Sequence, residues 1–349
     1  MRILLGMSGG LDSTYAARKL MDEGHVVEGA VLVMHKDTDI SAARESADAL
    51  GIPLHVVNAE ESFEKSVVEN FLDEYIHART PNPCIICNRE VKFERLLSFA
   101  IENGFDKIAT GHYASVEKIS IGNEERYALK RSRDIKKDQT YMLWRLSQKQ
   151  LAMLTLPLSD LEKSEVREAA RCEGLVAADR EESQEICFIP DGDYASFIEV
   201  RRGVSKKGSF INNEGKILGE HNGIIRYTIG QRKGLGIAMG ERVFVTDIDI
   251  INNTITLSPD DSYADYIMIS DVVFSGISEM NAGDERDLFV KVRYLAPMIK
   301  ARLKYLGDGR AEARLESPVR AVTPGQSAVF YDGDLLALGG FIDSARLDK

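Results

Sequence analysis

A glycine-rich turn near the start of the chain constrains its fold more than any other feature. The turn is Ser8-Gly9-Gly10-Leu11-Asp12-Ser13, and it follows a short apolar run, Arg2 to Met7, that predicts a buried strand. After the turn, Thr14 to Met21 has helical spacing that ends near Gly24. Two glycines let a backbone turn sharply and approach a ligand, and the free N–H groups of a helix start favour an anion. The sequence therefore predicts a phosphate-binding loop between a strand and a helix.

The loop differs from the two commonest nucleotide motifs. A Walker loop ends in Gly-Lys-Ser/Thr, but the first lysine here is Lys19, and no Gly-x-Gly-x-x-Gly is present. The order Ser-Gly-Gly-x-Asp-Ser resembles the PP-loop of the N-type ATP pyrophosphatases, which split ATP between its α and β phosphates. That resemblance implies that the backbone holds pyrophosphate and that Asp12 helps to place Mg²⁺, a hard cation with oxygen ligands. The alternative interpretation, an ordinary strand–helix turn, fits six residues in this order poorly.

Composition predicts a soluble globular protein. The 349 residues are 44% apolar and 28% charged, enough for two or three domains. No apolar run is long enough to span a bilayer, and Met1 to Leu4 leads into the expected first strand rather than into a cleavable signal. Four cysteines in so long a chain form no disulfide framework. We therefore expect a cytoplasmic protein without a membrane partner.

Charge is unevenly distributed along the chain. The net charge of −11 argues against a nucleic-acid partner at first sight. Residues 37–74, however, hold ten acidic and two basic side chains, whereas residues 126–149 hold eight basic and two acidic ones. The second segment is a basic stripe that a phosphate backbone would attract. The alternative is a solvated charged face, which charge alone favours.

The first half of the chain alternates strands and helices. Strands are expected at 26–34, 54–57 and 107–110, and helices at 63–78, 90–103 and 41–50, the last with Ser41 as cap and Gly51 at its end. This alternation predicts an α/β fold with a parallel sheet. Ligands of such sheets bind at the carboxyl ends of the strands, where the loop, Met34 and Gly111 fall.

The pattern changes near residue 200. Helical periodicity fades after 193–200, and turns follow at 206–208 and 212–215. From about Arg242 onward, short β-rich runs alternate with turns and predict a small C-terminal antiparallel β-barrel; the runs are 243–248, 254–257, 288–294, 301–305, 311–315 and 328–331. We expect an N-terminal catalytic domain at 1–200, a small central domain at 201–262 and the barrel at 263–349.

Three of the four cysteines are candidates for reactive thiols. Cys84 and Cys87 lie in Asn82-Pro83-Cys84-Ile85-Ile86-Cys87-Asn88, just before the helix expected from Glu90. A thiol at a helix N-terminus has a lowered pKa and is more reactive. A zinc knuckle is the alternative, but no second Cys-x-x-Cys or histidine pair completes one. Cys187 is the third, whereas Cys172, inside an apparent helix at 162–173, is expected to be a small buried thiol.

Seven motifs occur in one order along the chain. They are the phosphate loop, the segment from Asn82 to Asn88, Gly111 to Ala114, Lys137 to Gln139, Cys187 to Ile189, Tyr227 to Gly236 and Pro324 to Tyr331. Together they resemble the tRNA-specific 2-thiouridylases over nearly the whole chain. The resemblance implies ATP-dependent 2-thiolation of the wobble uridine, position 34 of tRNA. In that reaction ATP adenylates uracil O2 with release of pyrophosphate, and cysteine thiols then transfer sulfur.

The resemblance also implies roles for individual residues. The residues implied to bind ATP are Gly6, Met7, Ser8, Gly9, Gly10, Leu11, Asp12, Ser13, Met34 and Gly111. Cys87 corresponds to the nucleophile and Cys187 to the persulfide carrier, and the target base is implied to meet Asn82, Pro83 and Cys84. Positions matching tRNA contacts are His112, Lys137, Asp138, Gln139, Arg293, Tyr294 and Gln326. The implied partners are the anticodon stem-loop of tRNA, which the central domain would also contact, and a persulfide sulfur-carrier protein or free sulfide.

In the implied chemistry, a persulfide on Cys187 delivers sulfur to C2 of a flipped-out uracil, and Cys87 resolves it as a Cys87–Cys187 disulfide. Alternatively, the sulfide released by that resolution attacks C2. The disulfide must then be re-reduced, which suits a reducing compartment. Many family members have aspartate at the position of Cys84. Two interpretations stay open: Cys84, Cys87 and Cys187 bind a [4Fe–4S] cluster, or Cys84 is a spare or alternate resolving thiol.

Two other function classes share parts of this pattern. One is an ATP-dependent amide- or amidine-forming ligase resembling tRNA lysidine or argininosuccinate synthetase, but those enzymes lack the Cys87/Cys187 pair and the barrel. The other is a non-catalytic RNA-binding protein with a relic nucleotide site. The intact loop and both cysteines argue against the relic.

Overall fold

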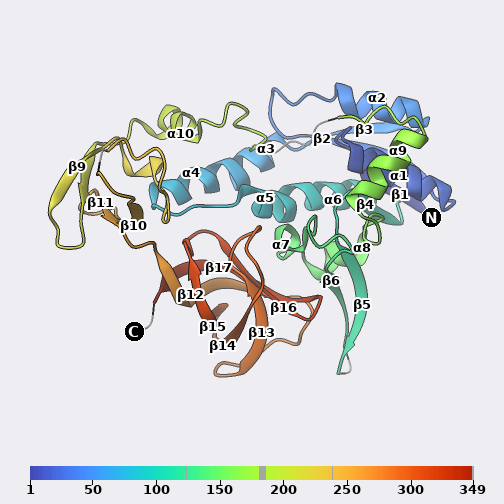
Figure 1. The fold of residues 1–349 in the computed structure, drawn as a ribbon. Helices are drawn as coiled ribbons and strands as arrows, with labels where there is room; N and C mark the ends of the chain where they lie inside the picture. Colours follow the sequence, from blue (N-terminus) through green and yellow to red (C-terminus); the bar gives the residue numbers. More distant parts are fainter. Residues whose placement is uncertain (123, 181–185, 238, 348–349) are drawn as a thin grey trace.

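The computed structural model describes residues 1–122, 124–180, 186–237 and 239–347, in three parts (Figure 1). Residues 182–185, which precede Cys187, and residues 348–349, at the end of the expected barrel domain, lie outside the described residues. Within the described ranges, no helix has both the length and the apolar character needed to cross a membrane.

The N-terminal part is built on a five-stranded parallel sheet of order β3-β2-β1-β4-β7. Its strands are β1 Arg2–Gly6, β2 Val26–Val33, β3 Leu54–Asn58, β4 Lys107–Thr110 and β7 Leu154–Thr155. The side chains of Ile3, Leu4 and Leu5 are fully buried. The strand order reverses direction between β1 and β4, where doubly wound sheets bind ligands. The predicted α/β class is confirmed.

Helices lie beside this sheet and also extend away from it toward the central strands of the chain (Figure 1). They are α1 Leu11–Asp22, α2 Ser41–Leu50, α3 Glu60–Phe63, α4 Glu69–Ile76, α5 Pro83–Ile86, α6 Phe93–Glu102, α7 Thr140–Leu143, α8 Gln148–Met153, α9 Lys163–Cys172 and α10 Tyr194–Arg202, with π-helical segments Glu64–Val68 and Cys87–Lys92. Gly51, left-handed at φ 67°, ends α2 as predicted. The prediction of Ser41 as its cap is wrong: Ser41 is already helical, and its N–H donates to the Asp39 carboxylate at 2.8 Å.

The helix expected from Glu90 begins seven residues earlier, at Pro83. Asn82 caps it by accepting a hydrogen bond from the Cys84 N–H at 3.2 Å, and Pro83 occupies the first position. The chain stays helical through α5, the segment Cys87–Lys92 and α6, which run from the centre of the molecule toward the N-terminal sheet (Figure 1). Cys87 therefore lies a full turn inside the helix, not at its start.

The central part is a four-stranded mixed sheet of order β10-β11-β8-β9 around the buried ring of Phe210. Its strands are β8 Gly208–Ile211, β9 Ile217–His221, β10 Phe244–Asp249 and β11 Thr254–Ser258. The expectation that the runs 243–248 and 254–257 join the barrel is wrong, because β11 pairs with β8 in parallel. Alternation along a strand reveals its buried face but not its partner strand.

The C-terminal part is a closed antiparallel barrel of order β12-β15-β14-β13-β16-β17, completed by pairing of β12 with β17. Its strands are β12 Tyr263–Phe274, β13 Glu285–Lys291, β14 Ile299–Gly307, β15 Arg310–Arg320, β16 Ser327–Asp332 and β17 Leu335–Arg346. The predicted barrel is confirmed. An unpredicted hairpin of the N-terminal part, β5 Ser115–Ile121 and β6 Glu124–Lys130, extends this sheet where Lys130 pairs with Leu335.

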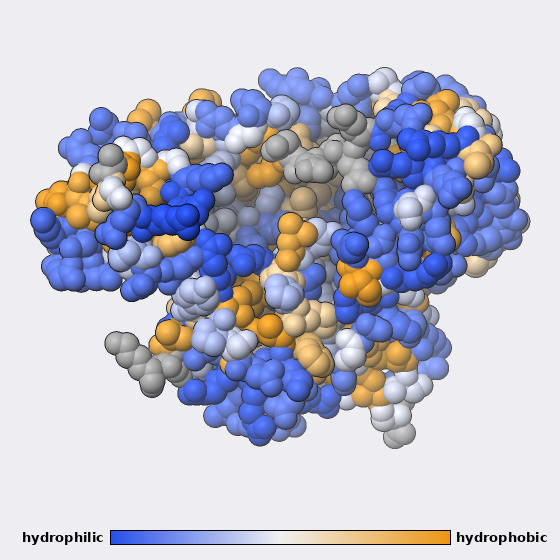
Figure 2. Space-filling view, viewed as in Figure 1, coloured by the Kyte–Doolittle hydropathy of each residue, from blue (hydrophilic) through white to orange (hydrophobic). Residues whose placement is uncertain are grey.

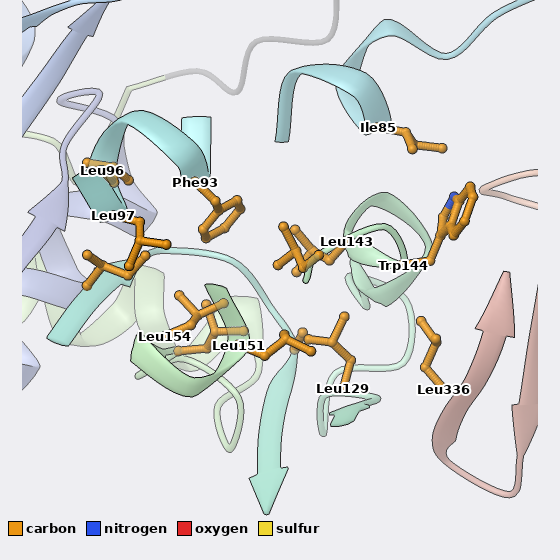
Figure 3. Close-up of a cluster of buried hydrophobic side chains, with 14 of the residues drawn as sticks. Ile85, Phe93, Leu96, Leu97, Leu129, Leu143, Trp144, Leu151, Leu154 and Leu336 are labelled. Carbon is orange, nitrogen blue, oxygen red and sulfur yellow. The ribbon is translucent and has the colours of Figure 1, made fainter. Parts of the chain in front are cut away.

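One hydrophobic cluster joins the N-terminal part to the barrel, with Trp144 and Leu336 on its two sides (Figure 3). The Trp144 indole N–H donates to Ser327 Oγ at 3.0 Å, and the Tyr141 hydroxyl donates to the Ser327 carbonyl at 2.9 Å. A Cβ at Gly339 would lie 2.6 Å from the Trp144 ring, so only glycine lets the two surfaces meet this closely.

Candidate active site

A cavity of about 530 Å³ opens at the carboxyl ends of β1, β2 and β4. Seven of the ten residues expected to bind ATP line it: Gly6, Met7, Ser8, Asp12, Ser13, Met34 and Gly111. Gly9, Gly10 and Leu11 lie outside its wall. The Leu11 side chain is buried in the core beneath the loop.

The loop keeps its shape because glycine is required at two positions. Gly9 has a φ of 79°, and a Cβ there would lie 2.2 Å from the backbone of Ala42. A Cβ at Gly111 would lie 2.7 Å from the Asp12 carbonyl carbon. No side chain caps the start of α1 at Gly10, so the first N–H groups of this helix are available to an anion at the cavity.

The Asp12 carboxylate is held by two groups that the sequence did not single out. The Lys163 ammonium, at the first position of α9, lies 2.7 Å from both carboxylate oxygens, and the Tyr113 hydroxyl donates to Oδ1 at 2.9 Å. A carboxylate at the phosphate loop supplies oxygen ligands of the kind that Mg²⁺ prefers, and in this structure the Lys163 ammonium and the Tyr113 hydroxyl are bound to it. Lys163 is 151 residues from Asp12, so no local pattern could have paired them.

The two thiols expected to work together lie in different surroundings. Cys187 lines the cavity, whereas Cys87 is 8% exposed and its thiol lies 3.9 Å from Met34 Sδ. Burial raises the pKa of Cys87 to about 12 and also raises the pKa of Cys187. The prediction of a lowered pKa at Cys87 is wrong, because this residue is inside the helix and shielded from water.

Cys84 and Cys172, like Cys187, are exposed. Cys84 is the second residue of α5, and its N–H is bound by the Asn82 cap. Cys172 ends α9 at the surface, so the expectation of a buried thiol is wrong. In the part of the chain that the structure describes, no three Cys, His, Asp or Glu side chains form a metal-binding group. The thiols of Cys84 and Cys187 nevertheless lie close enough to Cys87 to contribute to its raised pKa.

Several residues matched to tRNA contacts are turned inward. His112 lines the cavity and pairs through Nδ1 with Thr110 Oγ1 at 2.8 Å; burial lowers its pKa well below 6.5, so the ring is neutral. Gln139 also lines the cavity and accepts from the Tyr113 N–H at 2.9 Å. Asp138 is 2% exposed and accepts from Thr140 Oγ1 at 2.7 Å, and burial raises its pKa. The structure leaves Asp138 no free surface for direct contact with RNA.

The three parts of the molecule meet at Thr80, two residues before Asn82. The Gln326 side chain donates to the Thr80 carbonyl at 2.7 Å, and the Thr80 N–H donates to the Pro324 carbonyl at 2.8 Å. The Thr80 hydroxyl lies 3.3 Å from that of Thr228 in the central part. Gln326, expected at the RNA, thus fixes the loop that leads to Asn82, Pro83 and Cys84.

The remaining residues at positions that match tRNA contacts, here called RNA-matched residues, lie around α7. Tyr294 of the barrel lies 6.1 Å from the Tyr141 ring, between centroids, and Arg293 is beside it. Asn82 Nδ2 donates to Met142 Sδ at 3.4 Å, and Lys137 precedes α7 in the chain. Target-base and RNA-matched positions therefore flank the same short helix.

The segment 126–149 does not form one basic face. Arg126 donates to the carbonyl oxygens of Phe274 and Ile277, and the Arg145 guanidinium is stacked over the Trp144 and Phe341 rings. Two more cations are paired with carboxylates: Lys130 with Glu117 at 2.9 Å and Arg133 with Glu165 at 3.2 Å. The idea of a continuous stripe is wrong, because strand, loop and helices aim these residues in different directions. Lys136 and Lys149 remain exposed.

Family models cover almost the whole chain. Residues 1–191 match a tRNA methyl transferase HUP domain, residues 195–259 a tRNA methyl transferase PRC-barrel domain, and residues 264–342 an aminomethyltransferase beta-barrel domain. These ranges divide the chain close to the expected boundaries at 200 and 262.

Curated relatives match the chain from end to end. The tRNA-specific 2-thiouridylase MnmA of Acetivibrio thermocellus is 43% identical, over 98% of this chain and 99% of the relative. The protein of the same name from Clostridium acetobutylicum is 41% identical over the same shares. A solved 4-thiouridine synthetase–RNA complex with bound ATP is 21% identical over 57% of this chain and 50% of that chain, with a TM-score of 0.36, too low to support an argument. The full-length matches show that this chain belongs to the family of the tRNA-specific 2-thiouridylases.

Proposed function

We propose that this protein is an ATP-dependent tRNA 2-thiouridylase that replaces O2 of the wobble uridine by sulfur. One observation carries the proposal: Cys187 stands in the wall of the same cavity as Ser8, Asp12 and Ser13 of the phosphate loop. A ligase that makes amides or amidines from an adenylate has no use for a thiol at that place. A relic nucleotide site would not need the loop geometry that Gly9 and Gly111 preserve.

The first half of the reaction would activate the base. A uracil carbonyl does not exchange oxygen for sulfur unaided, because oxide is a poor leaving group. Uracil O2 attacks the α-phosphate of ATP, the bond between the α and β phosphates breaks, and pyrophosphate leaves at the start of α1. Asp12 would hold Mg²⁺, which neutralises phosphate charge, and the Lys163 ammonium is placed to stabilise the departing anion.

The second half would transfer sulfur. The terminal sulfur of a Cys187 persulfide attacks C2 and loses its proton, while the C2–O bond breaks and the oxygen leaves with AMP. The Cys87 thiol then loses its proton and attacks Cys187 Sγ. That step releases 2-thiouridine and leaves a Cys87–Cys187 disulfide, which a dithiol reductant returns to two thiols. Sulfide freed by resolution of the persulfide is the alternative attacking species.

The partners follow from this chemistry. The anticodon loop of tRNA must present its wobble base flipped out of the stack, near Asn82, Pro83 and Cys84. A persulfide sulfur-carrier protein or free sulfide supplies the sulfur. We assign the catalytic domain to residues 1–200, a small RNA-contacting domain to 201–262 and the barrel to 263–349.

The direct test is mass spectrometry of nucleosides from tRNA incubated with the protein, ATP, Mg²⁺ and a persulfide donor. We expect 2-thiouridine from the wild type and none from Cys187→Ser, which should still release pyrophosphate. Cys172→Ser, a thiol removed far from the cavity, is the matched control and should be nearly silent. Equal loss in both variants would refute the thiol roles, and a methylated nucleoside in place of a thiolated one would refute the proposal.

Substitution of Cys84 distinguishes the route through a cysteine persulfide from the route through an iron–sulfur cluster. We propose that sulfur transfer proceeds through thiols without iron. Anaerobically prepared protein should then be colourless, and Cys84→Asp, which restores the commoner family motif, should keep or gain activity. A brown preparation with iron and acid-labile sulfide, lost together with activity in Cys84→Asp, would establish the cluster instead.

A further inference from the structure

Lys92 lines the cavity, and its environment differs from that of Lys163, which contacts the cavity residue Asp12 without being a lining residue itself. Lys92 is partly buried beside Cys187 and His112 in the cavity wall. Among the described residues, no hydrogen bond or ion pair engages its ammonium group, whereas Lys163 is bound to Asp12. A partly desolvated cation without a counter-ion, at a cavity that takes an anionic ligand, indicates a ligand-binding role.

The helix is deformed at the point that brings this lysine to the thiols. In an α-helix, residues five apart point about 140° away from each other. Cys87–Lys92 is a π-helical segment, whose hydrogen bonds join residue i to residue i+5, so Lys92 lies over Cys87. Such single turns occur frequently at functional sites. The local geometry therefore places one ammonium group beside both the nucleotide cavity and Cys87.

Electrostatics agree with this placement. The positive charge of Lys92 acts to lower the pKa of both Cys87 and Cys187, against the larger opposing effect of burial. It also contributes to the lowered pKa of His112. These three groups come from different segments of the chain, so Lys92 lies where they converge.

We propose that Lys92 is a catalytic cation of the sulfur-transfer half-reaction, holding the α-phosphate of the adenylated uracil and stabilising AMP as it departs. The inference rests on the proposed function and deepens it. When sulfur forms its bond to C2, the C2–O bond breaks and the electron pair leaves with AMP, which gains one negative charge. The ammonium of Lys92 meets that charge and keeps its own proton. Lys163 remains with Asp12 at the phosphate loop, where pyrophosphate leaves.

The test separates the two half-reactions in a single turnover. Wild type and Lys92→Met are first incubated with tRNA, ATP and Mg²⁺ while pyrophosphate is measured; a persulfide donor is then added and 2-thiouridine is followed. We expect pyrophosphate release within about threefold of wild type and thiolation slower by roughly 100-fold, the usual loss for one electrostatic group. Lys92→Arg should recover part of the rate because it keeps the charge. Lys65→Met, an exposed lysine in the other π-helical segment, should match wild type.

A binding measurement provides a readout that does not depend on turnover. By calorimetry, Lys92→Met should bind AMP about tenfold more weakly than wild type and pyrophosphate equally well. Wild-type AMP affinity in Lys92→Met, or thiolation at the wild-type rate, would overturn the inference. If AMP binding depends on Lys92 but the wild-type protein does not thiolate tRNA, the proposed function is refuted while the contact between Lys92 and AMP stands. Circular dichroism checks folding, and Lys92→Gln replaces the methionine variant if that one unfolds.

Discussion

Cys84 and Cys87 lie three residues apart in one helical stretch, yet one thiol is exposed and the other is buried against Met34. A helix start favours a thiolate only where water and the first N–H groups reach the sulfur. Neither water nor the first N–H groups of the helix reach the Cys87 sulfur, and its pKa rises to about 12. The nucleophilic role proposed for Cys87 therefore requires that its surroundings change when substrate binds.

Alkylation should reveal this difference directly. At pH 8, with a pKa of about 12, only about one Cys87 thiol in 10⁴ is ionised. We expect iodoacetamide to modify Cys84 and Cys172 well before Cys87. Mass spectrometry of the separate peptides measures the extent of modification at each cysteine. In urea the four cysteines should react at similar rates. Labelling of Cys87 as fast as Cys84 in the folded protein would contradict the burial argument.

The Asp12–Lys163 pair gives a second prediction at this scale. Asp12→Ala or Ser13→Ala should abolish pyrophosphate release while tRNA still binds, because the loop serves activation rather than docking. Lys163→Met should slow pyrophosphate release by roughly 10²-fold, since a charge that stabilises the leaving anion is removed. Lys65→Met, exposed in the π-helical segment Glu64–Val68, is the control. Adenylation at the wild-type rate in any loop variant would show that the loop has another role.

At the scale of elements, the short helix α7 connects the catalytic part to the barrel. Trp144, which follows α7, and Tyr141 both bind Ser327 at the start of β16, and Thr140 lies 3.0 Å from the Tyr331 hydroxyl. The buried Asp138 precedes them in the chain. These contacts fix α7 against the start of β16.

Ser327→Ala tests that connection. The change leaves the buried Trp144 N–H without an acceptor and should lower the free energy of unfolding by about 1–3 kcal/mol. The chain has one tryptophan, so its fluorescence in a urea titration reports on this junction alone. Ser120→Ala, on the exposed side of β5, should leave the midpoint unchanged. Equal midpoints for both variants would show that the junction does not depend on this hydrogen bond.

At the scale of the whole molecule, a protein with a net negative charge must bind tRNA, which is a polyanion. The face seen in Figure 2 is mostly hydrophilic, and a recess separates its two upper lobes, one over the central part and one over the N-terminal sheet. Most cations of the segment 126–149 are used inside the protein. Binding of tRNA therefore depends on a few exposed lysines and on the arrangement of the three parts around Thr80.

Salt titration measures that dependence. The affinity for tRNA should fall steeply with salt despite the net charge of −11, because binding releases counterions from phosphates. The double variant Lys136→Ala, Lys137→Ala should bind more weakly and reduce the log–log slope by about 1–2. Lys65→Ala should not change the slope. A salt-independent affinity in the wild type would refute phosphate contacts as the basis of binding.

The sequence by itself determined the local features of this protein. The apolar run at Arg2, the glycines of the loop and the βα alternation predicted the parallel sheet and the place of the phosphate site, because these depend on short-range backbone geometry and burial. The turn-rich C-terminal strands predicted the barrel for the same reason. The ordered motifs predicted the family. Pro83 after Asn82 also marked a helix start, although the expected start lay at Glu90.

Only the tertiary structure decided which distant groups meet and which are shielded from water. Lys163 reaches Asp12 across 151 residues, Lys92 reaches the cavity through a π-helical turn, and Gln326 fixes Thr80 rather than facing outward. Strands β10 and β11 carried a correct local pattern, but they pair with each other and β11 pairs with β8, outside the barrel. The pKa of Cys87 rises because neighbours from other segments exclude water from it. Pairing and desolvation are properties of the assembled core, and no local pattern of residues encodes them.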